Sequence, residues 1–326
     1  MKQYSTDELI EIASKYIGSK KYDRKPERLY APIEYILSLG GKRIRPVLML
    51  MAYNLYRDDI DTVMEQALAL ETYHNMTLVH DDVMDNSDMR RGKPTVHKLW
   101  NENTAILSGD TMLITAIKLM SSSDKENAGK ALDLFLTTML EIDEGQQMDM
   151  DFEERNDVTT PEYIEMIRLK TAVFLASALK IGALLAGADD DDADTLYHFG
   201  EQLGLAFQLQ DDYLDVYGDP AVFGKPIGGD IAEGKKTFML INAYAKANDG
   251  QRKELNRLLS LDESARAERI SAVTALYTEL GIDKLSQNLI VEYGNKAMES
   301  LNRLSVAEER KQPLIDFAEK MLKRKK

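Results

Sequence analysis

The sequence predicts an all-α fold, and three observations support that prediction. Apolar residues recur with the 3.6-residue period of a helix, and short polar breaks separate the periodic segments. The helix-favouring residues Leu, Ala, Met, Glu and Lys dominate, whereas the 326 residues include only 8 Pro and 19 Gly. The strict apolar–polar alternation of a half-buried strand is hard to find.

The expected helices follow from these breaks, taken in chain order. The N-terminal segment MKQYSTDELIEIASKYI carries Asp7 and Glu8 and no continuous apolar stretch, so it predicts an amphipathic helix rather than a signal peptide. Thr160 is expected to cap a helix that begins at Pro161. Clusters of Gly, Pro and short polar residues place the breaks at 40–41, 92–94, 121–124, 156–161, 187–194, 218–234 and 248–250.

The most apolar segment, Ala172 to Ala188, contains Lys180 and is too short to cross a bilayer, so it predicts a buried core helix and no transmembrane segment. A length of 326 residues suggests about two domains. None of the breaks, however, resembles a long Pro- and Ser-rich linker, and no repeat of 20 to 50 residues is apparent. We therefore expect one helical domain over residues 1–326.

The charge and cysteine content exclude several functions. With 41 Lys and Arg against 55 Asp and Glu, the formal net charge is −14, which disfavours binding to nucleic acid or anionic membranes. The absence of cysteine excludes disulfides, thiolate zinc sites and cysteine nucleophiles, and it suits the cytoplasmic location that we expect. Many carboxylates crowd into short clusters, which is costly unless cations lie among them.

Two aspartate clusters predict a magnesium site. DDVMD spans Asp81 to Asp85 and DDYLD spans Asp211 to Asp215, each in an apolar helical pattern, so residues four apart share a helix face. Carboxylates on one face repel, and Mg²⁺ completed by phosphate oxygens would reverse that repulsion. The candidate metal ligands are Asp81, Asp82, Asp85, Asp211, Asp212 and Asp215. A third match, at Asp190, Asp191 and Asp194, lacks nearby Arg or Lys and is expected to be a solvated acidic loop.

Basic residues accompany the two clusters. Arg90 and Arg91 follow the first, and because arginine pairs bidentately with phosphate, they favour a metal-diphosphate site over a surface salt-bridge network. The run FGKPIGGDIAEGKKT follows the second and supplies Lys225, Asp230, Lys235 and Lys236. The segment GGKRIRP, residues 40–46, is either an ordinary basic turn or an anion site, in which paired Gly permit close backbone approach.

Together GGKRIRP, HDDVMDNSDMRRGKPT, the Lys170-Thr171 pair, FQLQDDYLD and GKPIGGD…GKK closely resemble the trans-isoprenyl diphosphate synthases, the family of farnesyl and geranylgeranyl diphosphate synthases. The resemblance runs from about Gly40 to Lys236. It implies an all-α bundle around a deep central cavity, with the two aspartate motifs on facing helices, and it implies a homodimer. It also implies magnesium as the cofactor, with about three ions per site.

The resemblance assigns roles residue by residue. Asp81, Asp82 and Asp85 would act with residues that hold the allylic diphosphate or contact the developing cation, namely Arg90, Lys170, Thr171, Gln208, Lys225 and Lys235. The pocket for isopentenyl diphosphate would comprise Gly41, Lys42, Arg45, His74 and Arg91. Gln146, Asp149 and Asp230 would form an outer shell, with Gln146 also at a position that contacts substrate or cation. Phe174 replaces a Tyr of several relatives, which leaves a hydroxyl contact in doubt.

The implied reaction is head-to-tail condensation of isopentenyl diphosphate with an allylic diphosphate. Breaking the carbon–oxygen bond separates an allylic cation from diphosphate, and magnesium with Lys and Arg around the leaving oxygens would stabilise that separation. No side chain near the motifs has the signature of a general base, so the released diphosphate is expected to take the proton. His80 is expected to orient the aspartates, while His97 and His198 are expected to be structural or surface residues.

Product length should depend on Met76 and Tyr73, five and eight residues before Asp81. Tyr73 lies roughly 4.5 Å further along the helix axis than Met76 and would form the firmer floor. Both are equally compatible with plain core packing. As a floor they predict a product of fifteen or twenty carbons, with a longer-chain synthase as the alternative.

Other functions remain open at this point. A terpene cyclase or a head-to-head synthase would share the fold, but both are disfavoured by GGKRIRP, which serves a second diphosphate. A non-catalytic helical partner subunit or an acidic cation-binding protein is disfavoured because both aspartate motifs and their basic partners are retained. The C-terminal residues 323–326, KRKK, are either a solvated helix end or a closure over isopentenyl diphosphate.

Overall fold

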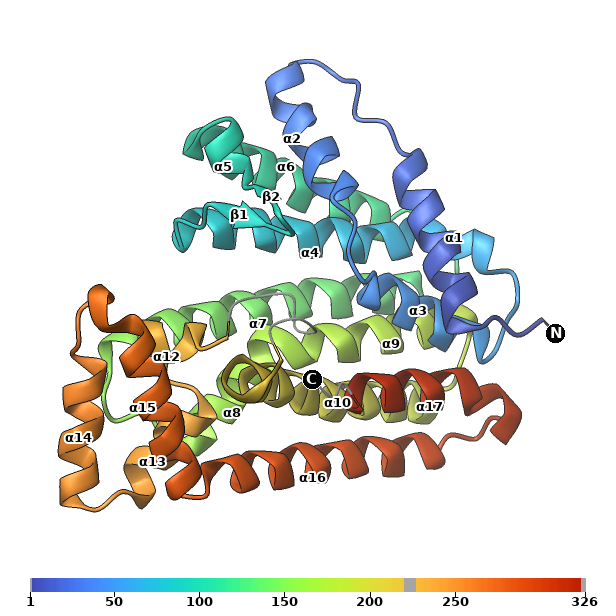
Figure 1. Cartoon of the computed structure of the whole chain (residues 1–326). Coiled ribbons are helices and arrows are strands. Elements are labelled where there is room, and N and C mark those ends of the chain that lie inside the picture. Colours follow the sequence, from blue (N-terminus) through green and yellow to red (C-terminus); the bar gives the residue numbers. More distant parts are fainter. Residues whose placement is uncertain (1, 220–226, 324–326) are drawn as a thin grey trace. The chain divides into compact units, whose positions relative to one another are not determined.

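A computed structural model describes residues 2–219 and 227–323 of the chain (Figure 1). Nearly all regular structure in these residues is α-helical, which confirms the predicted all-α class. The strands described are β1 (Met89–Arg90) and β2 (Lys93–Pro94), an antiparallel hairpin that pairs Met89 with Pro94. Its position coincides with the expected break at 92–94.

The chain groups into two compact units. Unit 1 comprises Met1–Thr137, Ser177–Tyr197 and Leu304–Leu314, and unit 2 comprises Thr138–Ala176, His198–Arg303 and Ile315–Lys326. Four of the five boundaries fall within helices, namely α7 (Ala128–Glu154), α9 (Val173–Ala186), α10 (Asp190–Tyr217) and α17 (Glu308–Leu322), and the fifth follows Arg303. The single domain and the deep cavity between facing motifs stay predictions.

Unit 1 is built around α4 (Met64–Met84), which packs along α6 (Glu102–Met120). Helix α2 (Glu27–Ser38) crosses α6, and α3 (Ile44–Asn54) lies against α4 (Figure 1). Helix α3 is apolar all round, and accordingly every residue from Pro46 to Asn54 is buried. The other helices of this unit are α1 (Thr6–Ser19), η1 (Ile60–Val63) and α5 (Val96–Leu99). The predicted N-terminal helix is confirmed as α1. Ser5 and Glu8 form a capping box at its start.

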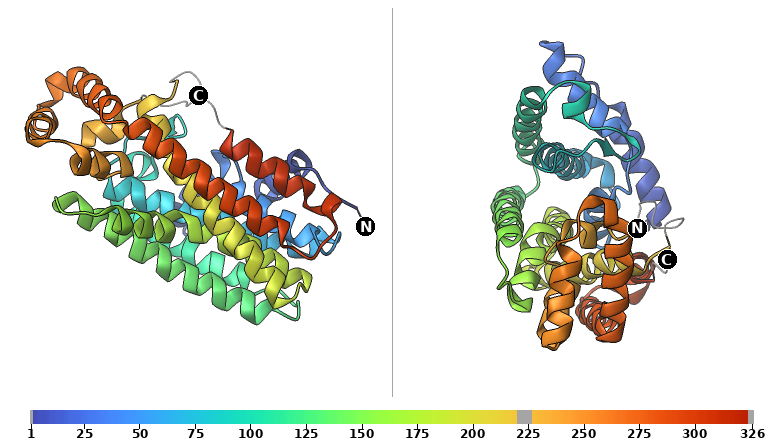
Figure 2. Two further views of the ribbon diagram at one scale, coloured as in Figure 1. Left: turned by 90° about the horizontal axis from the view of Figure 1, so that it is seen from below. Right: turned by 60° about the vertical axis from the view of Figure 1, so that its left-hand side comes forward.

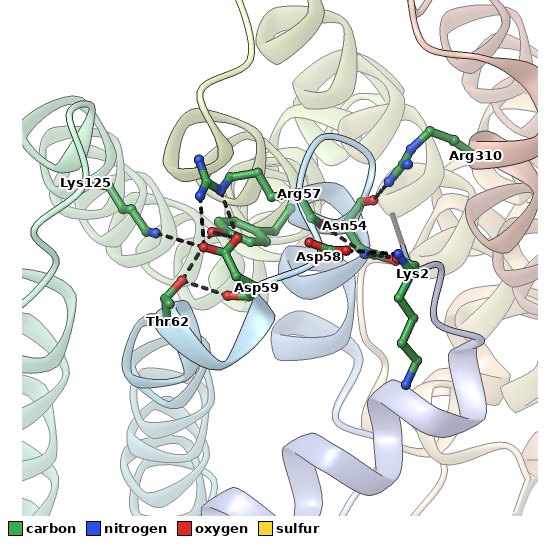
Figure 3. A network of polar contacts seen from close by, with 9 residues as sticks. Lys2, Asn54, Arg57, Asp58, Asp59, Thr62, Lys125 and Arg310 are labelled. Carbon is green, nitrogen blue, oxygen red and sulfur yellow. Dashed lines mark hydrogen bonds and ion pairs between the residues drawn. The ribbon is translucent and has the colours of Figure 1, made fainter.

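Polar side chains fasten the N-terminal segment to the end of α3 (Figure 3). The Asn54 amide nitrogen donates to the carbonyl oxygens of Lys2 and Arg57 at 3.0 and 2.9 Å, and the Tyr4 amide donates to its oxygen at 3.0 Å. Arg310 donates to the Asn54 carbonyl from the other side. Because Asn54 is only 5% exposed, these bonds satisfy a side chain that would otherwise be buried at a cost.

Two apolar clusters lie among the described residues of unit 2. One gathers Leu255, Val273 and Tyr277 where α14 and α15 lie side by side (Figure 2), and the other surrounds Tyr163 and Leu209. Its remaining elements are α8 (Thr160–Ile167), the π-turn η2 (Arg168–Ala172), α12 (Gly229–Glu233), α13 (Phe238–Lys246), α14 (Asp249–Leu259), η3 (Glu263–Ala265), α15 (Arg266–Glu279) and α16 (Ile282–Asn302).

Two local predictions are wrong. Thr159 rather than Thr160 caps α8, because its hydroxyl and the Glu162 carboxylate complete a capping box one residue earlier. The acidic run at Asp190 opens α10 rather than forming a loop, and it does have cationic partners. Lys130 pairs with Asp190 at 2.8 Å and Lys180 pairs with Asp194, and both lysines are too distant in sequence for the local pattern to reveal.

The predicted core helix is longer than expected. Because α8, the π-turn and α9 are continuous, Thr160–Ala186 forms a 27-residue helix that, among the described residues, is the one long and apolar enough to cross a membrane by length and composition. The expectation that this segment is too short is therefore wrong. Its most apolar window is 83% buried, as in the core helix of a globular protein, so its length is only weak evidence for a membrane span.

Candidate active site

The first aspartate motif ends α4, and the β1–β2 hairpin folds back onto it. Asp82 is 1% exposed, and one of its oxygens, Oδ1, accepts from Arg90 Nε and Nη2 at 3.0 and 2.6 Å. The Ser87 amide donates to the Asp82 carbonyl at 3.0 Å, which tightens the return of the chain. The other carboxylate oxygen, Oδ2, is buried without a hydrogen-bond partner. Such an atom is costly to bury, so it suits a cation.

The other two aspartates of this motif are more accessible. Asp81 lies on the last turn of α4 and is partly buried, whereas Asp85 is the exposed C-cap. The structure therefore places the predicted ligands of this motif at one helix end.

In the loop before α3, another group comes close to the glycine backbone, as the paired glycines predict. That group is the guanidinium of Arg91. Gly40 and Gly41 have φ of 76° and 139°, a region that disfavours side chains. A Cβ on Gly41 would lie 3.0 Å from the guanidinium carbon of Arg91. Arg91 donates to the Gly40 carbonyl and, at 3.3 Å, to Asn75 Oδ1, while Lys42 is exposed.

A buried carboxylate supports this basic cluster, and the sequence analysis missed it. Glu71, 2% exposed, pairs with the buried guanidinium of Arg43, which also donates to the Leu37 carbonyl at 2.9 Å. Asn75 Nδ2 donates to Glu71 Oε1 at 3.0 Å and thereby links Arg91 to the pair. The one available signal was a charged residue in the apolar stretch ALALETYH.

Electrostatics make this cluster a strongly positive site. Burial lowers the pKa of Arg45 to about 10, with Glu71 offsetting part of the effect. Burial, together with Arg45 and Arg91, holds the pKa of His74 well below its usual range, so its imidazole is neutral at pH 7. Burial also lowers the pKa of Arg91. Because few carboxylates balance these guanidinium groups, an anion would be favoured here.

The two residues predicted as a floor are both in the interior of unit 1. Tyr73 is 1% exposed and Met76 is 5% exposed. The Tyr73 ring meets the Phe135 ring edge-on, with centroids 5.8 Å apart, which fixes its orientation.

The second aspartate motif, in unit 2, is bound by hydrogen bonds around Asp212. This residue is 8% exposed, and its carboxylate accepts from the Tyr163 hydroxyl and, at 3.0 Å, from Gln208 Nε2. Asp215 accepts from the Asp230 amide at 3.0 Å. Asp211 is partly buried on the same helix turn. Tyr163 has no motif of its own, so the sequence analysis missed it.

The π-turn carries the Lys170-Thr171 pair. Lys170 Nζ lies 2.5 Å from Asp149 Oδ2, and Lys235 Nζ lies 3.6 Å from the same oxygen. The Thr171 hydroxyl donates to Gln208 Oε1 at 3.1 Å. The residues predicted around the second motif thus come together.

Gln146 and Lys225 complete the set of residues predicted around the second motif. Gln146 is half-buried on α7, and Lys225 lies outside the described residues.

The carboxylates of unit 2 repel one another. Burial raises the pKa of Asp212 to about 6, while burial and the charge of Asp212 raise that of Asp230 to about 7. At Lys235 burial opposes the charged form, but Asp149, Asp230 and Asp212 outweigh it and raise the pKa. Lys235 and Lys170 in turn lower the pKa of Asp149 despite its burial. A bound dication would relieve this repulsion.

The donor set fits a magnesium site that substrate completes. Within residues 2–219 and 227–323, no three His, Asp or Glu side chains already converge on one point. Each motif supplies oxygen donors, with an unsatisfied buried oxygen at Asp82 and raised pKa values at Asp212 and Asp230. Magnesium commonly binds through one or two carboxylates and takes its other ligands from substrate phosphates and water.

The remaining histidines are His80, His97 and His198. His80 Nε2 lies 3.1 Å from the Ile106 carbonyl and 3.9 Å from Asp110 Oδ1, and its ring sits over Gly109 of α6. It therefore packs on a neighbouring helix, and its expected role in orienting the aspartates stays a prediction. His97 is buried and His198 is exposed. Phe174 is 2% exposed, as a core residue.

Comparison with known proteins covers nearly the whole chain. The family model of polyprenyl synthetases matches residues 26–277. A geranylgeranyl diphosphate synthase of Methanosarcina mazei is 40% identical over 302 residues, 92% of this chain and 91% of that protein. A geranylfarnesyl diphosphate synthase of Natronomonas pharaonis is 37% identical over 333 residues, 96% and 95% of the two chains. A solved geranylgeranyl pyrophosphate synthase matches with a TM-score of 0.94 and 42% identity, over 99% of this chain and 100% of that chain.

Proposed function

Since the chain belongs to the polyprenyl synthetase family and is a prenyltransferase, we propose that it extends an allylic diphosphate with isopentenyl diphosphate to a twenty-carbon prenyl diphosphate. The observation that carries this proposal is that the cations beside the two acidic motifs, Arg90, Lys170 and Lys235, are separate from the basic cluster around Arg45 and Arg91. Two diphosphates require two such sets of cations. The relatives are named for twenty- and twenty-five-carbon products, which favours the upper end of the predicted fifteen or twenty carbons.

In the proposed mechanism the two motifs hold the allylic diphosphate. Asp82 and Asp212, with the other motif aspartates, would bind magnesium, which when present neutralises the departing diphosphate. Arg90, held by Asp82, and Lys170 and Lys235, held by Asp149, would donate to the same leaving group. Fixed cations stabilise charge that develops only as the carbon–oxygen bond breaks, so they accelerate that step.

The basic cluster of unit 1 would bind isopentenyl diphosphate. Arg45 and Arg91 supply fixed positive charge, and Lys42 is exposed on the adjoining loop. Neutral His74 would donate one hydrogen bond to this diphosphate. Its lowered pKa makes it a weak base, which leaves the diphosphate released from the allylic substrate as the acceptor of the proton lost from the new chain.

Incorporation of labelled isopentenyl diphosphate tests this function. The purified chain is supplied with Mg²⁺ and dimethylallyl, geranyl or farnesyl diphosphate, and a twenty-carbon diphosphate is the expected main product. Chelation of the metal should abolish its formation. A cyclase would release diphosphate without consuming isopentenyl diphosphate, and a non-catalytic partner would form no product, so either result would contradict the proposal.

Product length is expected to increase when the interior floor is removed. Tyr73→Ala combined with Met76→Ala opens space beside Phe135, so chains of twenty-five carbons or more should form. Such cavities cost about 3–5 kcal/mol of stability each, so folding is checked by thermal unfolding. Met49→Ala, at a fully buried site on α3, is the control that creates a cavity without lengthening the product. An unchanged product in the double variant would refute the floor.

We also propose that a second copy of the chain covers an apolar face of α5 and α6. Leu99, Ile106, Leu107 and Ile114 are 48, 44, 58 and 60% exposed, and adjoining exposed apolar residues mark an interaction surface. Leu107→Glu with Ile114→Glu should therefore yield monomers in analytical ultracentrifugation. Val291→Glu, an equally exposed apolar site on α16, should leave the dimer intact. A monomeric native chain would contradict this proposal.

The cytoplasmic location stays a prediction.

A further inference from the structure

The π-turn Arg168–Ala172 lies between two glycines in unit 2. A Cβ on Gly145 of α7 would come within 2.8 Å of Lys170 Cα and 2.9 Å of the Leu169 carbonyl carbon. A Cβ on Gly204 of α10 would come within 2.6 Å of Ala172 Cα and 2.8 Å of its Cβ. Real Cβ atoms do not approach other atoms so closely. The obstructing atoms are mostly backbone, which cannot move aside as the end of a flexible side chain can.

Each glycine also shares a helix face with a residue of the second site. Gly145 lies four residues before Asp149 on α7, and Gly204 lies four residues before Gln208 on α10. Residues four apart in a helix project on the same side. The faces of α7 and α10 that touch the π-turn therefore also present Asp149 and Gln208, the partners of Lys170 and Thr171.

Those partners bind the π-turn directly. Asp149 lies 2.5 Å from Lys170 Nζ, and Gln208 accepts from Thr171 at 3.1 Å while donating to Asp212. A π-turn widens the helix locally. Such turns are rare in proteins as a whole, but many of those that occur are at functional sites. An added Cβ would lie 2.4 Å from Lys170 N at position 145 and 2.6 Å from Ala172 Cα at position 204, whereas ordinary contact begins at 3.4 Å. The π-turn would therefore have to move by about 1 Å, which would lengthen both contacts.

Helical stability alone does not account for these glycines. A glycine inside a helix costs about 1 kcal/mol relative to alanine, so alanine would be favoured at both positions if space allowed. Gly129 near the start of α7 shows the contrast, since nothing lies within 4 Å of a Cβ added there. The close approach of the π-turn is the feature that requires the two interior glycines.

We propose that Gly145 and Gly204 are positioning residues, which hold the π-turn so that Lys170 and Thr171 meet the allylic diphosphate. This inference rests on the proposed function of the second site. It assigns to two residues without reactive groups a defined effect on catalysis, exerted through Lys170 and Thr171.

Steady-state kinetics of Gly145→Ala and Gly204→Ala test the inference, with Gly129→Ala as the matched control. A misplacement of about 1 Å costs on the order of a hundredfold in rate, so kcat should fall by about that factor in the first two variants. The KM for isopentenyl diphosphate should stay unchanged, because its proposed residues belong to unit 1. Gly129→Ala should match the native enzyme. Native kcat in Gly145→Ala or in Gly204→Ala would overturn the proposal for that glycine.

A double-mutant cycle separates positioning from general destabilisation. If Gly145 acts through Lys170, then Gly145→Ala combined with Lys170→Met should lose no more activity than Lys170→Met alone. Gly204→Ala with Thr171→Val forms the second cycle, so the proposal stays testable should one glycine variant fail to fold. Fully additive losses would indicate a merely structural role and overturn the proposal.

Binding of inorganic diphosphate gives a readout that does not depend on prenyl transfer. Calorimetric titration with diphosphate and Mg²⁺ should show about tenfold weaker binding in Gly145→Ala and native binding in Gly129→Ala, a difference of about 1.4 kcal/mol. Absence of prenyl product with the native enzyme would refute the proposed function yet leave this comparison valid. Equal diphosphate binding in the two variants would refute the inference for Gly145.

Discussion

Replacing Asp82 by asparagine is expected to lower kcat by about a thousandfold, the scale of losing a fixed electrostatic contact to developing charge. The buried carboxylate oxygen without a partner is the proposed magnesium ligand, and the other oxygen holds Arg90. Asparagine keeps the size of the side chain but removes the charge that both cations need. Steady-state kinetics over a range of Mg²⁺ concentrations should show a lower kcat and a requirement for more metal.

The chain supplies its own control for this prediction. Asp190 belongs to the third DDxxD match, where it is exposed and pairs with Lys130. Asp190→Asn removes the same charge from the same sequence pattern, and native activity is expected. If Asp82→Asn retained native activity, or if both variants lost activity alike, the placement of the metal at the first motif would be wrong.

Asp82 and Arg90 illustrate the kind of proximity that local sequence can indicate, although their ion pair itself was not predicted. They are eight residues apart, and a hairpin is enough to bring the guanidinium back to the carboxylate, so the motif and the contact coincide. The helical class likewise follows from a period that repeats along the whole chain. Each of these inferences uses residues that are neighbours in sequence.

Contacts between distant segments were not predictable in the same way. The partner of Arg43 is Glu71, 28 residues later, and the partner of Asp212 is Tyr163, 49 residues earlier. Neither Glu71 nor Tyr163 lies in a motif, so only the packing of helices identifies it. The expectation of a solvated acidic loop at Asp190 fails for the same reason, because Lys130 and Lys180 reach it only in the fold. A charge pattern reveals which residues need partners, but the tertiary fold decides which partners they obtain.

Replacing Lys235 by methionine is expected to lower kcat by about a hundredfold. Lys235 and Lys170 share Asp149, and the charge of Lys235 also lowers the pKa values of Asp212 and Asp230. Without that charge the carboxylates repel one another more strongly, and the leaving diphosphate loses a donor. Lys236→Met is the matched control, since it removes the neighbouring positive charge, and near-native kcat is expected from it.

The same substitution should change how stability depends on pH in the metal-free protein. Asp212 and Asp230 titrate at about 6 and 7, above the 3.8 of an unperturbed aspartate, so the folded state binds protons that the unfolded chain has released. Their contribution to stability is therefore full below pH 3.8 and is lost as pH rises through 6 and 7. Lys235→Met raises both pKa values further, so the fall in melting temperature between pH 5 and pH 8 should be steeper than in the native protein or in Lys236→Met. Added Mg²⁺ should reduce that fall in melting temperature, because a dication restores the missing positive charge. If Lys235→Met kept the native pH profile, the charge of Lys235 would not act on these aspartates.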